Sequence, residues 1–416
     1  MARRIYSLPR LDQLTNDQKR VLRLKKEGQY LVVGSPGTGK SVVALLRARE
    51  YADQDKSLFL TFNHVLSQAT NQLSEGQIHC QTAMSWFYEL YWTLTGGKAE
   101  TFEQDKMPER VAHKPDYQLV DDRFDKVSKD FSGYQLIIDE GQDLPEGWYD
   151  CLWTLGFENF FVVADQNQQI TEENSDKKQL KASLGIEDIA EIKNGNKVKK
   201  DDPKHVIALK DNFRNTTPIA IFANTFYTDK TSPLPDIPDR PSTDIPILYE
   251  FGAIDKISEM ILSEYDRDPS KLIGFIVPTE NKREWYAKKL GNDNKERSNP
   301  GPVISTYSSQ QKGDVNIDFS FGGIVVLNDK SVKGIEFDTV FIILDDFKLI
   351  NNDIERLQKR FYVMSSRAKE KLFLFRSAVR PSVVDDILPK EGDVFSYENK
   401  VTGMKVEEEI MKRRKI

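Results

Sequence analysis

A glycine-rich stretch at residues 30–46 carries the clearest chemistry in the chain, between an apolar run and a run with helical spacing. Lys40 can reach the β- and γ-phosphates of a nucleotide, and Ser41 can offer its hydroxyl to Mg²⁺. Three glycines let successive backbone N–H groups turn inward around a polyphosphate: Gly34, Gly37 and Gly39. The spacing therefore predicts a strand, a phosphate loop and a helix.

Two carboxylates follow a second apolar run, residues 136–138. Asp139 can complete a Mg²⁺ shell, and Glu140 can orient and deprotonate the water that attacks a γ-phosphate. An acidic strand end is common by itself, but a phosphate loop upstream makes the pair strong evidence for nucleoside triphosphate hydrolysis. A third apolar run, residues 159–164, leads to Gln168, whose amide can reach the same phosphate.

The elements that must position these residues are apolar runs of strand length separated by helical patterns. Such alternation predicts parallel sheets with helices on both faces and ligands at the carboxyl ends of the strands. A capped helix is expected at residues 14–24, before the phosphate loop, and it contains Gln18. The other predicted strands are 57–62, 78–82, 134–138, 272–277, 322–327, 339–344 and 371–375.

Composition describes a globular protein of two or three domains. The chain has 416 residues, 39% hydrophobic and 30% charged, and no apolar run approaches the ~20 residues that span a bilayer. We therefore expect a cytoplasmic protein without a membrane partner. Two cysteines, Cys80 and Cys151, exclude a disulfide framework. The net charge of −6 argues against a protein that coats nucleic acid over its whole surface, but it leaves a local basic groove open.

From residue 14 to about 375, the order of motifs resembles the UvrD/Rep-like branch of superfamily 1 DNA helicases. The resemblance implies an α/β fold with two RecA-like P-loop NTPase domains, parallel sheets, and an ATP site in the cleft between them. We expect domain 1 at residues 1–208 with a small insertion at about 97–132, domain 2 at 209–385, and a C-terminal tail at 386–416. The matching segments beyond the phosphate loop are 61–63, 82–86, 139–143, 165–168, 209–215, 331–338 and 361–368.

The resemblance also implies roles for individual residues. Gln18 would read adenine, Phe213 would stack on it, and Glu336 would bind the ribose side. Arg214 and Arg367 would act as arginine fingers, which suits phosphoryl transfer because charge develops at the γ-phosphate. The candidate catalytic set is Lys40, Glu140, Gln168, Arg214 and Arg367. The candidate ATP-binding set is Gln18, Gly34, Gly37, Thr38, Gly39, Lys40, Ser41, Phe213 and Glu336, with Ser41 and Asp139 holding Mg²⁺.

Binding of single-stranded nucleic acid requires aromatic rings that stack on bases and cations that follow the backbone. By resemblance, the candidate contacts are Phe62, Asn63, Thr82 and Trp86. The aromatic spacing from Trp86 to Trp92 is also typical of a helix face in a core, so we expect Trp92 to be buried and Phe62 to be the best base contact. The partner implied is single-stranded DNA, with RNA left open, and movement would run 3′ to 5′.

The chain departs from the family pattern where inserted subdomains would be expected. Residues 97–132 and 290–322 leave little room for them, and 171–174 replace an aromatic segment. Two readings therefore stay open. One is an ATP-dependent translocase or helicase on single-stranded DNA. The other is a nucleotide-gated ATPase subunit that regulates a partner nuclease or another effector, for example in antiviral defence.

Overall fold

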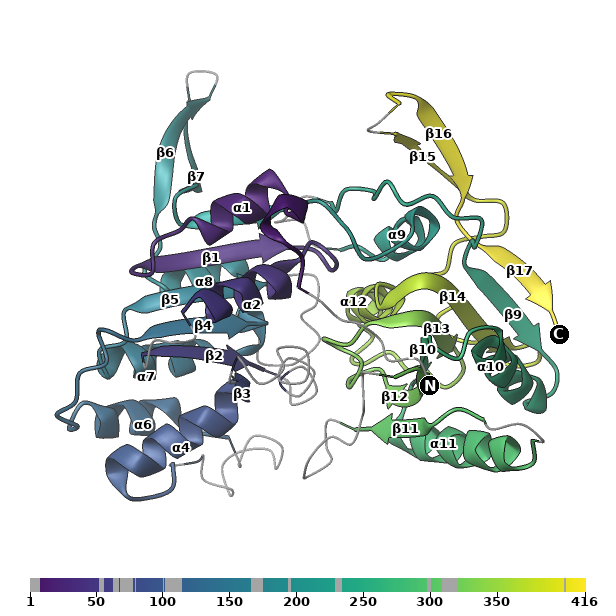
Figure 1. Cartoon of the computed structure of the whole chain (residues 1–416), viewed down its shortest axis with the longest axis horizontal. Helices are drawn as coiled ribbons and strands as arrows, with labels where there is room; N and C mark the ends of the chain where they lie inside the picture. Colours follow the sequence, from purple (N-terminus) through teal and green to yellow (C-terminus); the bar gives the residue numbers. More distant parts are fainter. Residues whose placement is uncertain are drawn as a thin grey trace. The chain divides into compact units, whose positions relative to one another are not determined.

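A computed structural model describes residues 8–51, 56–62, 67, 78, 80–99, 101, 114–165, 175–193, 196–228, 234–297, 301–308, 321–399 and 402–416. The chain divides into two compact units. The N-terminal unit comprises residues 8–34 and 39–209, and the C-terminal unit includes residues 35–38 and 210–416. Both are α/β units built on a central sheet (Figure 1).

The sheet of the N-terminal unit is parallel throughout, in the order β3-β2-β4-β5-β1-β8. Because β4, β5 and β1 are neighbours, the loops that leave their carboxyl ends emerge side by side. The strands are β1 Gln29–Gly34, β2 Ser57–Thr61, β3 Cys80–Thr82, β4 Gln135–Asp139, β5 Asn159–Ala164 and β8 Val206–Leu209.

Helices cover both faces of this sheet. Successive side chains of a strand alternate between faces, so Val32 of β1 packs with Val43 and Ala44 of α2, whereas Leu31 packs in the opposite core with α4 and α7. The first face carries α1 Asn16–Leu22 and α2 Lys40–Glu50, and η1 Leu11–Gln13 precedes α1. The second carries α4 Ala83–Thr95, α6 Tyr117–Phe124, α7 Glu146–Thr154 and α8 Lys177–Ser183.

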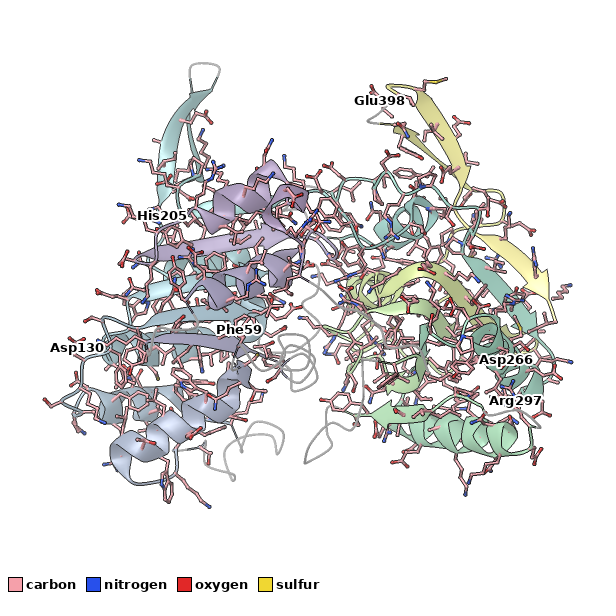
Figure 2. The ribbon with its side chains drawn as sticks, viewed as in Figure 1. Phe59, Asp130, His205, Asp266, Arg297 and Glu398 are labelled. Atoms are coloured by element: carbon pink, nitrogen blue, oxygen red, sulfur yellow. The ribbon has the colours of Figure 1, made fainter. Side chains whose placement is uncertain are left out.

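A hairpin of β6 Asp188–Lys193 and β7 Asn196–Asp201 projects from this unit (Figure 1). Both strands are rich in charged residues. Lys181 pairs with Asp188 and, at 2.8 Å, with Asp201 at the hairpin base. His205, labelled in Figure 2, then joins the chain to β1, because its carbonyl accepts from the Leu31 N–H at 2.8 Å.

The C-terminal unit also contains a parallel sheet, in the order β11-β12-β10-β13-β14-β9-β17. Its helices are α9 Thr217–Asn224, α10 Asp255–Arg267, α11 Glu280–Lys295 and α12 Ile354–Ser365. α10 and α11 pack on one face, and α12 contacts α9 and β14 on the other. The strands are β9 Ile247–Phe251, β10 Leu272–Val277, β11 Ile304–Tyr307, β12 Gly323–Asn328, β13 Phe337–Ile343, β14 Ala368–Ser377 and β17 Lys412–Lys415.

The segment 386–416, expected as a tail, is structured over its described residues, 386–399 and 402–416. A hairpin forms from β15 Val394–Glu398 and β16 Lys405–Glu409, and β17 extends the sheet as an edge strand beside β9. Buried Ile410 and Met411 anchor the chain between them. The charged residues 412–415 therefore form a strand. Backbone pairing with β9 and the burial of Ile410 and Met411 stabilise this strand, although its composition is typical of a solvated tail.

The predicted fold class is confirmed: the protein is α/β, and its two parallel sheets fit two RecA-like domains. Within the described part of the chain, no helix is both long enough and apolar enough to cross a bilayer.

Candidate active site

The candidate site of the N-terminal unit lies where three neighbouring strands end. Within this unit, β1 leads to Gly34, and the end of the phosphate loop, Gly39 and Lys40, begins α2. Asp139 is the last residue of β4 and Glu140 follows it, and Asp165 follows β5. Parallel strands deliver their carboxyl ends to one edge of a sheet, so residues that are far apart in sequence meet here.

The phosphate loop has the backbone that its glycines predict. Gly37 and Gly39 have φ of 80° and 83°, and Gly39 is the N-cap of α2. A side chain at Gly39 would overlap the amide of Gln18, and one at Gly37 would meet Asn212 and Arg214. Buried Thr38 donates its hydroxyl to the Ser35 carbonyl at 2.8 Å. The loop is therefore held in a cradle that only glycine fits at these points.

Lys40 begins α2 and forms a buried ion pair. Its Nζ lies 3.3 Å from Asp165 Oδ2, and the two side chains are only 8% and 3% exposed. The ammonium is thus directed to a carboxylate at the end of β5. A phosphate placed in the loop would compete with Asp165 for the same cation.

Asp139 has the chemistry of a Mg²⁺ ligand. Burial and the adjacent Glu140 carboxylate raise the pKa of Asp139, while Ser41 and Lys40 act in the opposite direction. Its Oδ1 accepts from the Glu140 N–H, and its buried Oδ2 lacks a hydrogen-bond partner among the described residues. Mg²⁺ prefers oxygen ligands, and the Asp139 Oδ2 atom lies on a carboxylate that interacts with the Ser41 hydroxyl. Asp139 and Ser41 therefore fit Mg²⁺.

Glu140 is held in a rare conformation by its neighbours. It has φ 58°, in the left-handed region, and precedes η3 Gly141–Asp143. The Gln142 amide donates to Glu140 Oε2 at 2.6 Å and accepts from the Asp165 N–H at 3.0 Å. Gln142 therefore connects the candidate base after β4 to the end of β5, and it fixes the direction of the Glu140 carboxylate.

The C-terminal unit assembles a second charged cluster around Glu336. Arg214 Nε donates to Glu336 Oε1 at 2.7 Å, and Lys369 Nζ lies 3.4 Å from Oε2. Burial disfavours the carboxylate, but the charges of Arg214 and Lys369 outweigh it and lower the pKa of Glu336 to about 2. Glu336 therefore stays ionised and holds the Arg214 guanidinium in place.

Asn215 joins the segments that carry the two candidate arginine fingers. Its Nδ2 donates to the carbonyls of Ser366 and Ala368, on either side of Arg367. Arg367 itself is buried, and its Nε donates to the Val363 carbonyl at 3.0 Å. The structure thus brings the segments of Arg214 and Arg367 together within one unit.

Phe213 is the candidate residue for stacking on adenine. Its ring is 49% exposed, and its N–H donates to the Gly37 carbonyl at 2.9 Å, which connects it to the phosphate loop. Gln18, the candidate adenine reader, lies on α1 with its side chain buried against Gly39.

The candidate nucleic-acid contacts are less well supported. Trp86 is only 8% exposed and packs against Trp148 and Phe157, so in this structure it is a core residue rather than a base contact. Thr82 is the N-cap of α4, and Phe62 is half-buried against the core. The expectation for Trp92 is wrong, because it is 57% exposed.

Two candidates, Asn63 and Gln168, lie outside the described residues. Sequence reasoning also missed three residues that the structure places at the sites: Asp165 as the partner of Lys40, Asn215, and Lys369. A signal existed for Asn215. Asn212 and Asn215 flank Phe213 and Arg214, and Asn212 Oδ1 accepts from the Arg214 N–H at 3.0 Å, as asparagine commonly does in turns.

Comparisons with known proteins place a recognised domain in this region. Residues 18–174 match the family model of an AAA domain, and this range contains the phosphate loop and both acidic residues. No curated protein matches the chain. One similar solved structure is the C-terminal domain of a possible DNA helicase from Lactobacillus plantarum. It is 17% identical, with a TM-score of 0.29, and the alignment covers 42% of this chain and 94% of that one. A TM-score this low does not establish a shared fold.

Proposed function

We propose that this protein hydrolyses ATP and couples hydrolysis to movement on single-stranded DNA, in the 3′ to 5′ direction and in the cytoplasm. One observation carries the hydrolytic part. Glu140 is oriented by Gln142 at the end of β4 and follows Asp139; β4 is separated only by β5 from β1, the strand that precedes the phosphate loop and Lys40. The AAA-domain match over the same residues supports it. DNA coupling rests on the resemblance of the ordered motifs to superfamily 1 helicases.

Each residue has a proposed part in the reaction. Glu140 accepts a proton from the attacking water, since its carboxylate is fixed by Gln142 at the sheet edge that also carries the end of β1. Lys40 leaves Asp165 to bind the nucleotide phosphates. Arg214 and Arg367 stabilise charge that develops at the γ-phosphate. Mg²⁺ would be held by Ser41 and Asp139, and it would supply charge neutralisation for the phosphate oxygens.

Steady-state ATP hydrolysis with and without single-stranded DNA tests this proposal. We expect many-fold stimulation by DNA, and a duplex with a single-stranded 3′ tail should be unwound in preference to one with a 5′ tail. A rate that neither DNA nor RNA changes would contradict an autonomous motor.

The placement of Trp86 favours a second candidate function. With Trp86 in the core and Thr82 used as a helix cap, the candidate base contacts are fewer than the sequence suggested. A nucleotide-gated subunit that controls a nuclease or another effector needs the ATP site but not those contacts. Hydrolysis that responds to a partner protein and not to nucleic acid would support this alternative.

A further inference from the structure

The connector between α1 and β1 is held by side chains from three elements of the N-terminal unit. Arg47 of α2 donates to the carbonyls of Leu24, at 3.0 Å, and Lys25. Gln135 of β4 donates to the Lys26 carbonyl at 3.0 Å, and the Tyr30 hydroxyl of β1 donates to the Glu27 carbonyl at 2.9 Å. Every backbone carbonyl from residue 24 to residue 27 therefore accepts a hydrogen bond from a side chain of the sheet or of α2.

Arg47 is the central member of this set. It is fully buried on the helix that begins at Lys40, and its guanidinium lies 4.7 Å from the Phe161 ring, 5.3 Å from Tyr51 and 5.8 Å from Tyr30. A buried charge is costly unless partners compensate for it. Burial lowers the pKa of Arg47, and the carbonyls and aromatic faces provide the compensation. An apolar side chain would fill the same space without this cost, so packing alone does not explain an arginine here.

The connector directly follows Arg23, the C-cap of α1, and α1 carries Gln18. The Gln18 side chain is buried against Gly39 of the phosphate loop, and its Oε1 accepts from the Thr15 N–H at 3.0 Å. A displacement of the α1 end would thus change the distance between the Gln18 amide and the loop. Discrimination between bases by hydrogen bonds depends steeply on the position of the donor and acceptor atoms, here those of the Gln18 amide.

We infer that Arg47 is a positioning residue that determines base specificity: by fixing the connector 24–27, it holds Gln18 where it distinguishes adenine nucleotides from guanine nucleotides. This inference rests on the proposed nucleotide site. Arg47 reaches the base only through α1, so it affects the choice of nucleotide and not the hydrolytic step. Gln135 of β4 also holds the connector, but it donates to one carbonyl, that of Lys26, whereas Arg47 donates to two.

The test compares Arg47→Met with Arg49→Met. Arg49 lies on the same helix but is exposed, so its variant makes the same chemical change without touching the connector. Calorimetric titration would measure the affinities for ADP and GDP. We expect the preference for ADP to fall about tenfold in Arg47→Met and to stay unchanged in Arg49→Met. Gln18→Ala should lose a similar preference, and adding Arg47→Met to it should cause little further loss, because both act on one contact.

Two further measurements separate positioning from general stability. Arg47→Lys and Gln135→Leu keep most of the packing, and we expect each to lose part of the ADP preference even if Arg47→Met does not fold. Hydrogen exchange of the α1 amides in the nucleotide-free protein should speed up in the connector variants but not in Arg49→Met. A folded Arg47→Met that keeps the wild-type preference, or losses from Arg47→Met and Gln18→Ala that simply add, would overturn the inference.

Failure of the proposed function has a different signature. Wild-type protein that binds ADP and GDP equally would refute base reading by Gln18 and, with it, the inference. Wild-type protein that hydrolyses no ATP but prefers ADP in a manner dependent on Arg47 would refute the proposed hydrolysis and support the inference.

Discussion

Replacing Lys40 by methionine should destabilise the nucleotide-free protein as well as impair its activity. Lys40 Nζ lies 3.3 Å from Asp165 Oδ2, and both side chains are almost fully buried. Removing one member of a buried ion pair leaves the other charge poorly compensated, at a cost of about 3 to 5 kcal/mol. In a unit of this size each kcal/mol corresponds to about 2 to 4 °C in Tm, so the expected fall is about 6 to 20 °C.

Thermal unfolding followed by circular dichroism, without nucleotide, measures this effect. The control is the double variant Lys40→Met, Asp165→Asn, in which a neutral amide of similar shape replaces the carboxylate that lost the Lys40 ammonium. We expect the double variant to recover most of the lost Tm. A single variant that loses less than about 1 kcal/mol, or a double variant no more stable than the single one, would refute the argument that this pair is energetically coupled.

Three further outcomes follow from the same structure. Trp86→Ala should cost about 3 to 5 kcal/mol in chemical denaturation, as a core truncation does, whereas Trp92→Ala should change stability by no more than about 0.5 kcal/mol; similar losses would contradict the packing described here. Asn215→Ala should cost about 1 to 3 kcal/mol and lower kcat, because the Ala368 and Ser366 carbonyls beside Arg367 lose the Asn215 amide, although Ser366 still accepts from Arg214 Nη1; unchanged kinetics would remove Asn215 from the site. Because the pKa of Glu336 is lowered to about 2 from 4.5, its stabilising effect is complete above about pH 4.5 and is lost as pH falls toward 2. The difference in unfolding free energy between wild type and Glu336→Gln should shrink over that range, and a constant difference would argue against the charge cluster.

Buried parallel strands were the most predictable part of the fold. Residues 272–277 form an uninterrupted apolar run, and β10 has those bounds, because a central parallel strand is covered on both faces. Edge strands carry no such signal. β17 reads Lys-Arg-Arg-Lys, a composition typical of a solvated tail, and only its pairing with β9 makes it a strand.

The error at Trp92 has a simple geometric cause. At about 100° per residue, positions six apart lie roughly 120° from one another around a helix, so Trp86 and Trp92 cannot share a narrow face. Phe87 and Tyr91, four residues apart, line the buried face instead. Spacing counted from the buried residues would have placed Trp92 in solvent.

The sequence predicted which residues lie at the candidate active site, but not which of them form hydrogen bonds or ion pairs with one another. The motifs and the order of strands in the sheet predict that Lys40, Asp139 and Glu140 lie at one edge of the sheet. The bonds of Gln142 to Glu140 and of Lys40 to Asp165 depend on side-chain direction, which neither periodicity nor motif spacing encodes. The same holds for Asn215, whose partners lie far away in sequence.

Paired measurement of ATP binding and ATP hydrolysis in Glu140→Gln tests the central claim most directly, because the substitution keeps the shape of the side chain and removes its basicity. We predict that hydrolysis falls by at least about a hundredfold while the affinity for ATP is retained, so that ATP remains bound and intact. A Glu140→Gln protein that hydrolyses ATP at the wild-type rate would contradict the account.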